Sequence, residues 1–533
     1  MKKIFYNGTI ITMEEELYAP AVLTSEGIIE KVGSFEELCA AAPDAERIDL
    51  GEKTMMPAFI DAHSHFSSYA NAQLQVALDE TASFDDISEK ITAFIHSHHL
   101  EAGTWIVAKG YDHNTLLEKC HPDKDWLDQI APQNPLILQH QSGHCGVLNT
   151  KALELLGITA DTPSPPGGVI GQKDGKLTGY MEEDAYIGCI KNVPISGMEE
   201  MLGAYKKAQE NYLSYGITTV QEGMMVAQML PLYQSLMESG LLTVDVVGYS
   251  DMSSMKTLAS AFKNSLNQYD KHFKIGGYKI FLDGSPQVKT AWMTTPYQGS
   301  DDNFGYGTMR DEDVIVAVRQ SAAEQVQILA HCNGDAAIWQ YINAVKTVAA
   351  EDTAITTLRP VIIHAQMMTG EQLEEAAKLH MIPSFFVAHV LHWGDVHIRN
   401  FGYERAKTIS PANTALKNHI MFTFHQDAPV IEPNMLETIQ CAVTRKTKTG
   451  VQLDENECID VLDALRAVTV HAAYQYREEK EKGSIKEGKH ADFVILSDNP
   501  LTVPREEIAN VIVVETIKDG KTVFLKDSTQ QLF

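Results

Sequence analysis

Long apolar runs and closely spaced cysteines are both missing from this chain of 533 residues. No stretch approaches the roughly 20 consecutive apolar residues that a membrane-spanning helix needs. The seven cysteines are scattered and form no Cys-x-x-Cys pair, which favours a reducing compartment over a disulfide framework. The first residues, MKKIFYNGTIITM, lack a sustained apolar core and a small-residue cleavage site, so they predict a β-hairpin and not a signal peptide. We therefore expect a cytoplasmic protein with no membrane partner.

Positive charge is also scarce. The chain has 43 lysines and arginines against 71 aspartates and glutamates, a formal net charge of −28. An acidic excess of this size argues against nucleic acid or anionic membranes as main partners. Hydrophobic residues make up 44% and charged residues 21% of the sequence, which is typical of a globular enzyme. Because the chain is too long for one ordinary core, we expect one large domain with additions.

Eight short apolar segments in the middle of the chain predict parallel strands. Helical patterns separate most of them, as in parallel βα units. The segments are 58–63, 216–223, 243–250, 276–284, 326–332, 360–366, 382–389 and 419–427. Eight such strands close a (β/α)₈ barrel. The predicted fold is thus α/β, a TIM-like barrel over residues 58–483.

The two ends of the chain are rich in short strands and turns. Neither residues 1–57 nor residues 484–533 could close a core alone, so we predict that they pair into one small composite β-sandwich domain. The first and second barrel strands are about 150 residues apart, far more than a simple crossover needs. Residues 66–210 are therefore predicted to be an insertion that covers the active-site face of the barrel.

Histidines and one carboxylate fall at the predicted strand ends. In MPAFIDAHSHF, His63 and His65 are two residues apart, and such residues point to the same side of a strand, where two imidazoles can meet one ion. His331, His364 and Asp427 stand at the ends of later strands. Each one alone could be a packing or capping residue. Their coincidence at the edge where barrels build active sites predicts a metal centre, with ligands that suit Zn, Mn or Fe.

Lys279, inside the fourth predicted strand, leaves two interpretations open. A charged lysine has no lone pair for a cation, so it could instead form an ion pair in the barrel interior with Asp283 or Glu222. Alternatively, burial lowers its pKa, and the neutral amine reacts with CO₂ to give N6-carboxylysine, whose two oxygens can bridge two ions.

Five segments in this order resemble the amidohydrolase superfamily: MPAFIDAHSHF, KIFLDGSPQVKTA, LAHCNGDAAI, IIHAQMM and FHQDAPV. The sequence is most similar to the amidohydrolase-3 group of YtcJ-like metal-dependent hydrolases, and the resemblance extends over essentially the whole chain. It implies one or two divalent metal ions, with zinc as the first choice. The implied ligands of the more buried ion are His63, His65 and Asp427; those of the second are His331 and His364, with carboxylated Lys279 as the bridge.

The resemblance implies hydrolysis of an amide-type, non-peptide C–N bond in a small-molecule substrate. A metal-bound hydroxide would attack the carbonyl, and Asp427 would be the catalytic proton shuttle. The candidates for substrate binding are His144, Glu182, Asp283 and Trp292, although each could instead be a structural residue. Deamination of an aminated ring and a non-catalytic regulatory role are the alternatives. Barrels of this type often self-associate, which leaves a homo-oligomer open.

Overall fold

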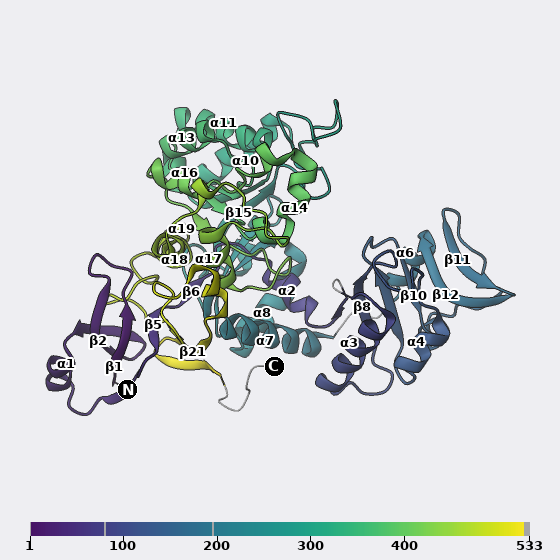
Figure 1. The fold of residues 1–533 in the computed structure, drawn as a ribbon, viewed down its shortest axis with the longest axis horizontal. Helices are drawn as coiled ribbons and strands as arrows, with labels where there is room; N and C mark the ends of the chain where they lie inside the picture. Colours follow the sequence, from purple (N-terminus) through teal and green to yellow (C-terminus); the bar gives the residue numbers. More distant parts are fainter. Residues whose placement is uncertain (1, 79–80, 194–196, 527–533) are drawn as a thin grey trace. The chain divides into compact units, whose positions relative to one another are not determined.

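The computed structural model describes residues 2–78, 81–193 and 197–526 (Figure 1). The chain divides into two compact units: Met1–Ser67 with Ala208–Phe533, and Ser68–Lys207. The first unit contains a parallel sheet and a sheet built from both ends of the chain, and the second unit is the insertion. Among the described helices, none combines the length and the apolar character needed to cross a membrane.

An eight-stranded parallel sheet forms the centre of the first unit. Its strands, in spatial order, are β6 (Phe59–Ile60), β13 (Ile217–Met225), β14 (Asp245–Ser250), β15 (Phe273–Phe281), β16 (Gln327–Cys332), β17 (Val361–His364), β18 (Ile382–Phe385) and β19 (Thr423–Phe424). Every neighbouring pair is parallel. Each predicted barrel segment overlaps one of these strands, so the predicted TIM-like α/β class is confirmed.

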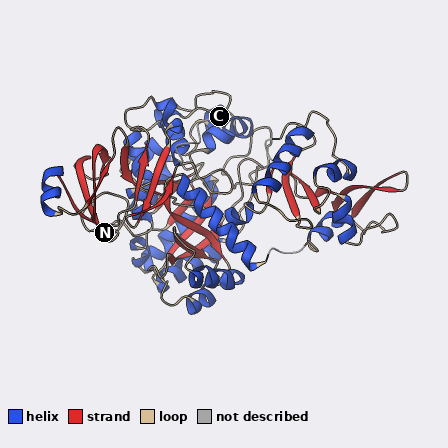
Figure 2. Cartoon of the chain, turned by 90° about the horizontal axis from the view of Figure 1, so that it is seen from below, coloured by secondary structure: helices blue, strands red, loops and turns tan. Residues whose placement is uncertain are grey.

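The first and last strands approach each other at their carboxyl ends. The backbone N–H of His65 donates to the carbonyl of Ala428 at 2.9 Å, and that of Asp427 donates to the carbonyl of His63 at 3.3 Å. Helices α10 (Asp311–Glu324), α11 (Asp335–Glu351) and α13 (Gly370–Lys378) connect successive strands, and Figure 2 shows helices around the strands of this sheet. All residues of β14 and β17 are buried, as expected for parallel strands covered on both faces.

Both ends of the chain share one mixed sheet. Its order is β22 (Lys521–Leu525), β21 (Val513–Lys518), β20 (Phe493–Leu496), β5 (Thr54–Pro57), β1 (Lys2–Ile11), β2 (Tyr18–Ser25) and β3 (Ile28–Gly33), with β4 (Glu46–Asp49) paired to β1. The antiparallel β5–β20 pair joins the N-terminal part to the C-terminal part. Phe5 and Phe493 pack edge to face at 5.6 Å, so residues from both ends bury one common core.

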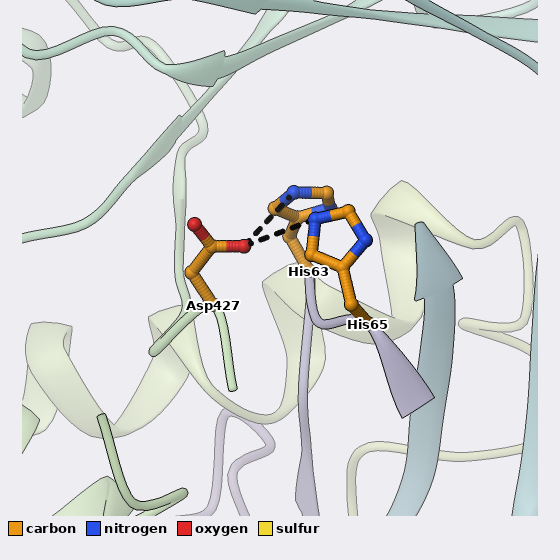
Figure 3. A group of neighbouring side chains, drawn as sticks. All are labelled: His63, His65 and Asp427. Atoms are coloured by element: carbon orange, nitrogen blue, oxygen red, sulfur yellow. Dashed lines mark ion pairs between the residues drawn. The ribbon is translucent and has the colours of Figure 1, made fainter. Parts of the chain in front are cut away.

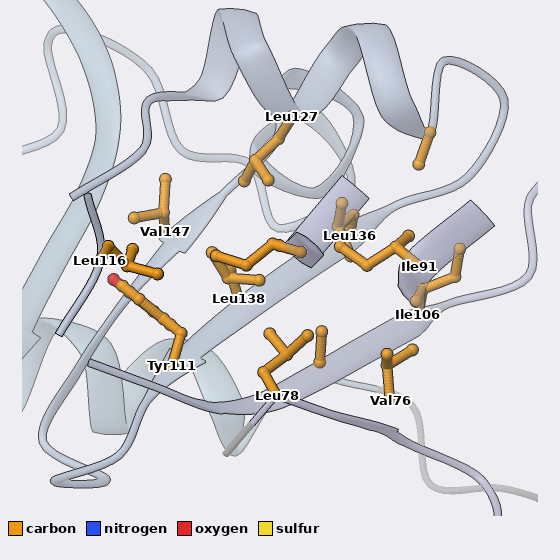
Figure 4. Packing of buried hydrophobic residues seen from close by; sticks show 13 residues of the cluster. Val76, Leu78, Ile91, Ile106, Tyr111, Leu116, Leu127, Leu136, Leu138 and Val147 are labelled. Carbon is orange, nitrogen blue, oxygen red and sulfur yellow. The ribbon is translucent and has the colours of Figure 1, made fainter. Parts of the chain in front are cut away.

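The insertion has its own sheet and core. The sheet order is β11 (Gly168–Lys173), β12 (Lys176–Glu183), β10 (Cys145–Leu148), β9 (Leu136–His140), β8 (Ile106–Tyr111) and β7 (Val76–Ala77). Strands β7, β8 and β9 are parallel, and the others pair antiparallel. Ile91 of α3 (Phe84–Ser97) and Leu127 of α4 (Lys124–Ile130) pack on strand residues Leu136 and Leu138 (Figure 4). That the insertion covers the active-site face stays a prediction.

Candidate metal centre

Two imidazoles and one carboxylate converge where β6 and β19 end. Oδ1 of Asp427 lies 3.4 Å from Nε2 of His63 and 3.4 Å from Nε2 of His65, and both rings turn toward this oxygen (Figure 3). The ligand atoms of the three residues all lie within 4.8 Å of one another. Among the described residues, the buried Oδ1 has no hydrogen-bond donor with good geometry. A cation at this point would satisfy it, so the donor set fits a divalent metal ion.

The hydrogen bonds behind His63 fix which of its nitrogens is free. The hydroxyl of Tyr476 donates to the carbonyl of Asp61 at 2.7 Å, and it therefore accepts the 2.9 Å hydrogen bond from Nε2 of Gln221. Gln221 Nε2 also donates to the carbonyl of Ala62 at 2.9 Å. The Oε1 atom of Gln221 must then accept from Nδ1 of His63, 2.5 Å away. This leaves the Nε2 lone pair of His63 for an ion, as in metal-ligating histidines generally.

Lys279, on β15, is buried beside these ligands. Its Nζ lies 3.1 Å from Nε2 of His63, and burial lowers the pKa of Lys279 to about 7. A substantial fraction of the amine is therefore neutral at neutral pH, the form that reacts with CO₂. Among the described residues, no ion pair joins Lys279 to Asp283 or Glu222. Asp283 instead accepts backbone hydrogen bonds, and Glu222 accepts hydrogen bonds from hydroxyl groups.

His331 and His364 form a second pair at the ends of β16 and β17. Nε2 of His364 lies 3.2 Å from Nδ1 of His331 and 3.9 Å from Oδ2 of Asp427. Nε2 of His331 lies 3.3 Å from the carbonyl oxygen of Gly284 and 3.1 Å from the amide nitrogen of Asn333. Burial, followed by the charge of Lys279, lowers the pKa of His331 to about 4. Burial and then His331 lower the pKa of His364 well below its usual value, so both rings are neutral, as ligands must be.

Two of the candidate ligands adopt an unusual backbone conformation. His364 has φ of 71° and Asp427 has φ of 58°, in the left-handed region that costs a non-glycine residue on the order of 1–3 kcal/mol. Such strain persists only where the surrounding structure holds it, and it clusters at functional sites. His364 is the last residue of β17 and Asp427 follows β19 by three residues, so the turn at each one directs a candidate ligand toward the centre near the end of its strand.

His425 completes the cluster and was not among the predicted site residues. Its Nε2 lies 3.1 Å from Nδ1 of His364, and its Nδ1 lies 2.8 Å from the hydroxyl of Ser384. The ring is fully buried, and burial lowers its pKa to about 3. With Nδ1–H of His364 donating to His425, Nε2 of His364 is left free for an ion. The signal was present in the sequence, since His425 precedes Asp427 by two residues, the same spacing as His63 and His65.

Asp283 and Trp292 lie close to His331 in the barrel unit. Asp283 accepts hydrogen bonds from the backbone N–H groups of Trp292, Asn333 and Gly334 at 3.1, 3.0 and 2.7 Å, and its Oδ1 lies 3.6 Å from Nε2 of His331. Burial raises the pKa of Asp283 to about 7. These contacts hold the loops after β15 and β16 in place, and substrate binding by either residue stays a prediction.

His144 and Glu182 belong to the insertion. His144 is exposed, and its Nδ1 lies 3.0 Å from a carboxylate oxygen of Glu183. Glu182 accepts a 2.7 Å hydrogen bond from the hydroxyl of Tyr180. Both side chains thus have partners within the insertion itself, and their contact with substrate stays a prediction.

A family comparison agrees with this donor set. Residues 46–524 match the family described as the Amidohydrolase family. The chain belongs to this family. The resemblance drawn from the sequence motifs is thereby confirmed.

Individual relatives match along nearly their whole length. This amidohydrolase is 27% identical to YtcJ of Bacillus subtilis, described as an amidohydrolase with no stated substrate, over 99% of the chain and 100% of YtcJ. It is 28% identical to an N-substituted formamide deformylase of Arthrobacter pascens over 94% of each chain. A crystal structure of an uncharacterized metal-dependent hydrolase from Pyrococcus furiosus matches with a TM-score of 0.75 at 23% identity, over 94% of this chain and 100% of that one, a likeness of fold.

Proposed function

We propose that this amidohydrolase hydrolyses an amide-type, non-peptide C–N bond in a small molecule. The observation that carries the proposal is the convergence of His63, His65 and Asp427, with a buried carboxylate oxygen among them that has no well-oriented hydrogen-bond donor in the described residues. A divalent metal ion, with zinc as first choice, would supply Lewis acidity and an acidified water. A purely regulatory protein would have no need of such a constellation.

The roles of the residues follow from their environments. His63, His65 and Asp427 would hold one ion, and His331 and His364 would hold a second. The neutral amine of Lys279 would add to CO₂ and release one proton, and the resulting carbamate would bridge the two ions. The catalytic group is Asp427. Burial alone would raise its pKa, but His65 and other neighbours keep that pKa below its usual value, so the carboxylate is ionised. It can accept a proton from water and return it to the leaving nitrogen.

The amide-type bond is supported by one relative. The Arthrobacter pascens protein is by its name a deformylase of N-substituted formamides, and it is 28% identical to this chain. That similarity supports the bond class and leaves the substrate open. We therefore propose N-acyl and N-formyl amines as the first compounds to test.

The test is a substrate screen with metal content measured in parallel. Metal-supplemented enzyme is assayed on N-formyl amines, N-acyl amines, cyclic amides and aminated rings. A free amine with a carboxylate reports amide hydrolysis, whereas ammonia released from a ring reports deamination. Asp427→Asn should lower kcat by roughly 10²–10⁴-fold. Asp313→Asn, at an exposed aspartate paired with Arg310, is the control and should change kcat less than about twofold.

Two results would contradict the proposal. Near-normal kcat in Asp427→Asn would remove the proposed proton carrier. The proposal would also be contradicted if protein from growth with zinc and manganese took up no metal and turned over none of the compounds.

A further inference from the structure

A histidine cluster lies at the carboxyl ends of two adjacent strands in the insertion. Asp112 and His113 directly follow β8, and His140 is the last residue of β9. We propose that Asp112, His113 and His140 bind a divalent transition-metal ion, forming a metal site wholly within the insertion. This site is additional to the barrel centre and does not depend on the proposed reaction.

The three side chains present their ligand atoms to one point. Nδ1 of His113 lies 3.2 Å from Nε2 of His140, and Oδ1 of Asp112 lies 3.3 Å from that Nε2 and 3.7 Å from Nδ1 of His113. All three atoms lie within 4.8 Å of one another. Imidazole with one carboxylate is a donor set suited to zinc and its neighbours in the first transition series, and less to calcium or magnesium.

The topology explains why these residues meet. Strands β8 and β9 are parallel neighbours, with Tyr111 opposite His140 in register. Side chains that follow parallel strands therefore emerge side by side at one edge, which is where open parallel sheets bind their ligands. The cluster thus has candidate ligands at the carboxyl ends of two parallel strands, and the barrel has them at the ends of several.

Hydrogen bonds around the cluster already orient two ligands. Oδ1 of Asp112 accepts from the backbone N–H and the side-chain amide of Asn114, both at 2.9 Å. The backbone N–H of Ser142 points at Nδ1 of His140 at 3.1 Å, and the hydroxyl of Ser142 lies 2.9 Å from the same nitrogen. Without metal, the proton of His140 is therefore on Nε2. When an ion takes Nε2, that proton moves to Nδ1 and is donated to the hydroxyl of Ser142, and the backbone N–H of Ser142 loses its acceptor.

The hydrogen bonds between the three side chains of this cluster are long. The single Nε2–H of His140 faces both Nδ1 of His113 and Oδ1 of Asp112, at 3.2 and 3.3 Å. Two acceptors, Nδ1 of His113 and Oδ1 of Asp112, thus share this one proton over long contacts, whereas one cation would interact with both of them and with Nε2 of His140. The side chains of His140, Asp112 and His113 are 12%, 24% and 31% exposed, so solvent can enter and supply the remaining ligands.

The direct test counts zinc on the full-length protein. Zinc is titrated to saturation and bound metal is measured per chain by equilibrium dialysis and elemental analysis. His113→Ala/His140→Ala should bind one zinc fewer than the wild type, and His140→Gln should bind that zinc at least about tenfold more weakly. The control, His96→Ala/His98→Ala, removes two exposed histidines at the end of α3 and should bind as many ions as the wild type.

A second measurement covers the case in which the double variant fails to fold. Protein whose barrel centre is already filled with zinc is titrated with cobalt, whose visible absorption reports its ligands. The wild type should show one further cobalt site, and Asp112→Asn, which keeps an oxygen acceptor for Asn114, should lose it. The proposal is overturned if the wild type and the folded double variant bind equal amounts of zinc, or if the wild type shows no further cobalt band. Either result would mean that the cluster binds no metal.

Discussion

The barrel centre and the histidine cluster of the insertion occupy equivalent places in two sheets but differ in how deeply they are buried. Both stand at the carboxyl ends of parallel strands and combine imidazoles with one aspartate. In the barrel, the side chains of His63 and His364 are 0% and 4% exposed, and that of His65 is 23% exposed. In the insertion, those of His140 and His113 are 12% and 31% exposed. The barrel centre thus includes fully buried candidate ligands, whereas all three candidate ligands of the insertion cluster are partly exposed.

Burial changes what the groups can do. In the barrel it lowers the pKa of Lys279 to about 7, and the candidate ligand histidines are held by further buried partners such as Gln221 and His425. In the insertion the supporting partners are a backbone turn and two polar side chains near the surface. We expect tight binding and catalysis at the first place, and weaker, exchangeable binding at the second.

Removing Lys279 should have the largest effect on the barrel centre. Lys279→Ala should lower kcat/KM by more than about a hundredfold and reduce bound metal, because the proposed bridge is a direct ligand. Acetate or propionate should restore part of the activity by placing a carboxylate in the vacated space. Lys279→Arg fills that space with a permanent charge and should not be rescued. The measurements are kinetics and metal content with and without added carboxylate.

The proposed carbamate would be visible in the intact mass. The wild type should carry an acid-labile increment equal to one CO₂, and Lys279→Arg should lack it. Full activity and full metal content in Lys279→Ala would instead show that this residue is no ligand.

Gln221 tests whether the buried support of the barrel ligands matters. Gln221→Leu removes the acceptor of the Nδ1 proton of His63 and should cost about 10–100-fold in metal affinity or activity. Gln221→Glu keeps an acceptor oxygen at the same place and should retain more metal affinity than Gln221→Leu. Competition with a chromophoric chelator measures both. Equal losses in the two variants would point to general damage of the core and not to the orientation of His63.

The candidate ligands could be selected from the sequence, whereas Gln221 could not. His63, His65 and Asp427 carry local signals, namely residue type, period-two spacing and a position after an apolar strand. Gln221 is a neutral residue inside a strand, and its partner His63 is 158 residues away. Only the assembled barrel brings the two together.

Strand lengths show a related limit. Segments 58–63 and 419–427 were predicted as strands, but only Phe59–Ile60 and Thr423–Phe424 pair in the sheet. The polar residues that follow leave the ladder to direct their side chains toward the centre, which hydropathy alone does not reveal. The six-stranded sheet of the insertion was also not predicted. Its strand β7 has only two residues, and the sheet combines parallel with antiparallel pairs.

The pH dependence of stability should differ between two aspartates, Asp61 in the barrel unit and Asp112 in the insertion. Burial raises the pKa of Asp61 to about 8, so the folded protein keeps a proton that the unfolded chain loses near pH 4. Stability should therefore fall as the pH rises from about 4 to about 8, and then level off. Asp61→Asn should gain up to about 1.4 kcal/mol in unfolding free energy over the wild type per pH unit in that range.

Asp112 of the insertion provides the matched comparison. Hydrogen bonds from Asn114 lower the pKa of Asp112, so this carboxylate is ionised in both states at neutral pH, and Asp112→Asn should show no such slope. Urea unfolding of metal-free protein between about pH 5 and pH 9 measures both variants. Parallel curves for Asp61→Asn and the wild type would mean that the environment of Asp61 is far wetter than its burial indicates.

The smallest expected effect concerns the share of the insertion in substrate binding. His144 is exposed and pairs with Glu183 at 3.0 Å, so a contact with substrate would be worth about one hydrogen bond. His144→Ala should raise KM about 2–10-fold with kcat unchanged, because a contact made equally in ground and transition states changes binding alone. Glu183→Gln keeps the imidazole but removes its charged partner, and should change KM less. A fall in kcat at unchanged KM would assign His144 to the chemical step, and the insertion would then contribute to the reaction at the barrel centre.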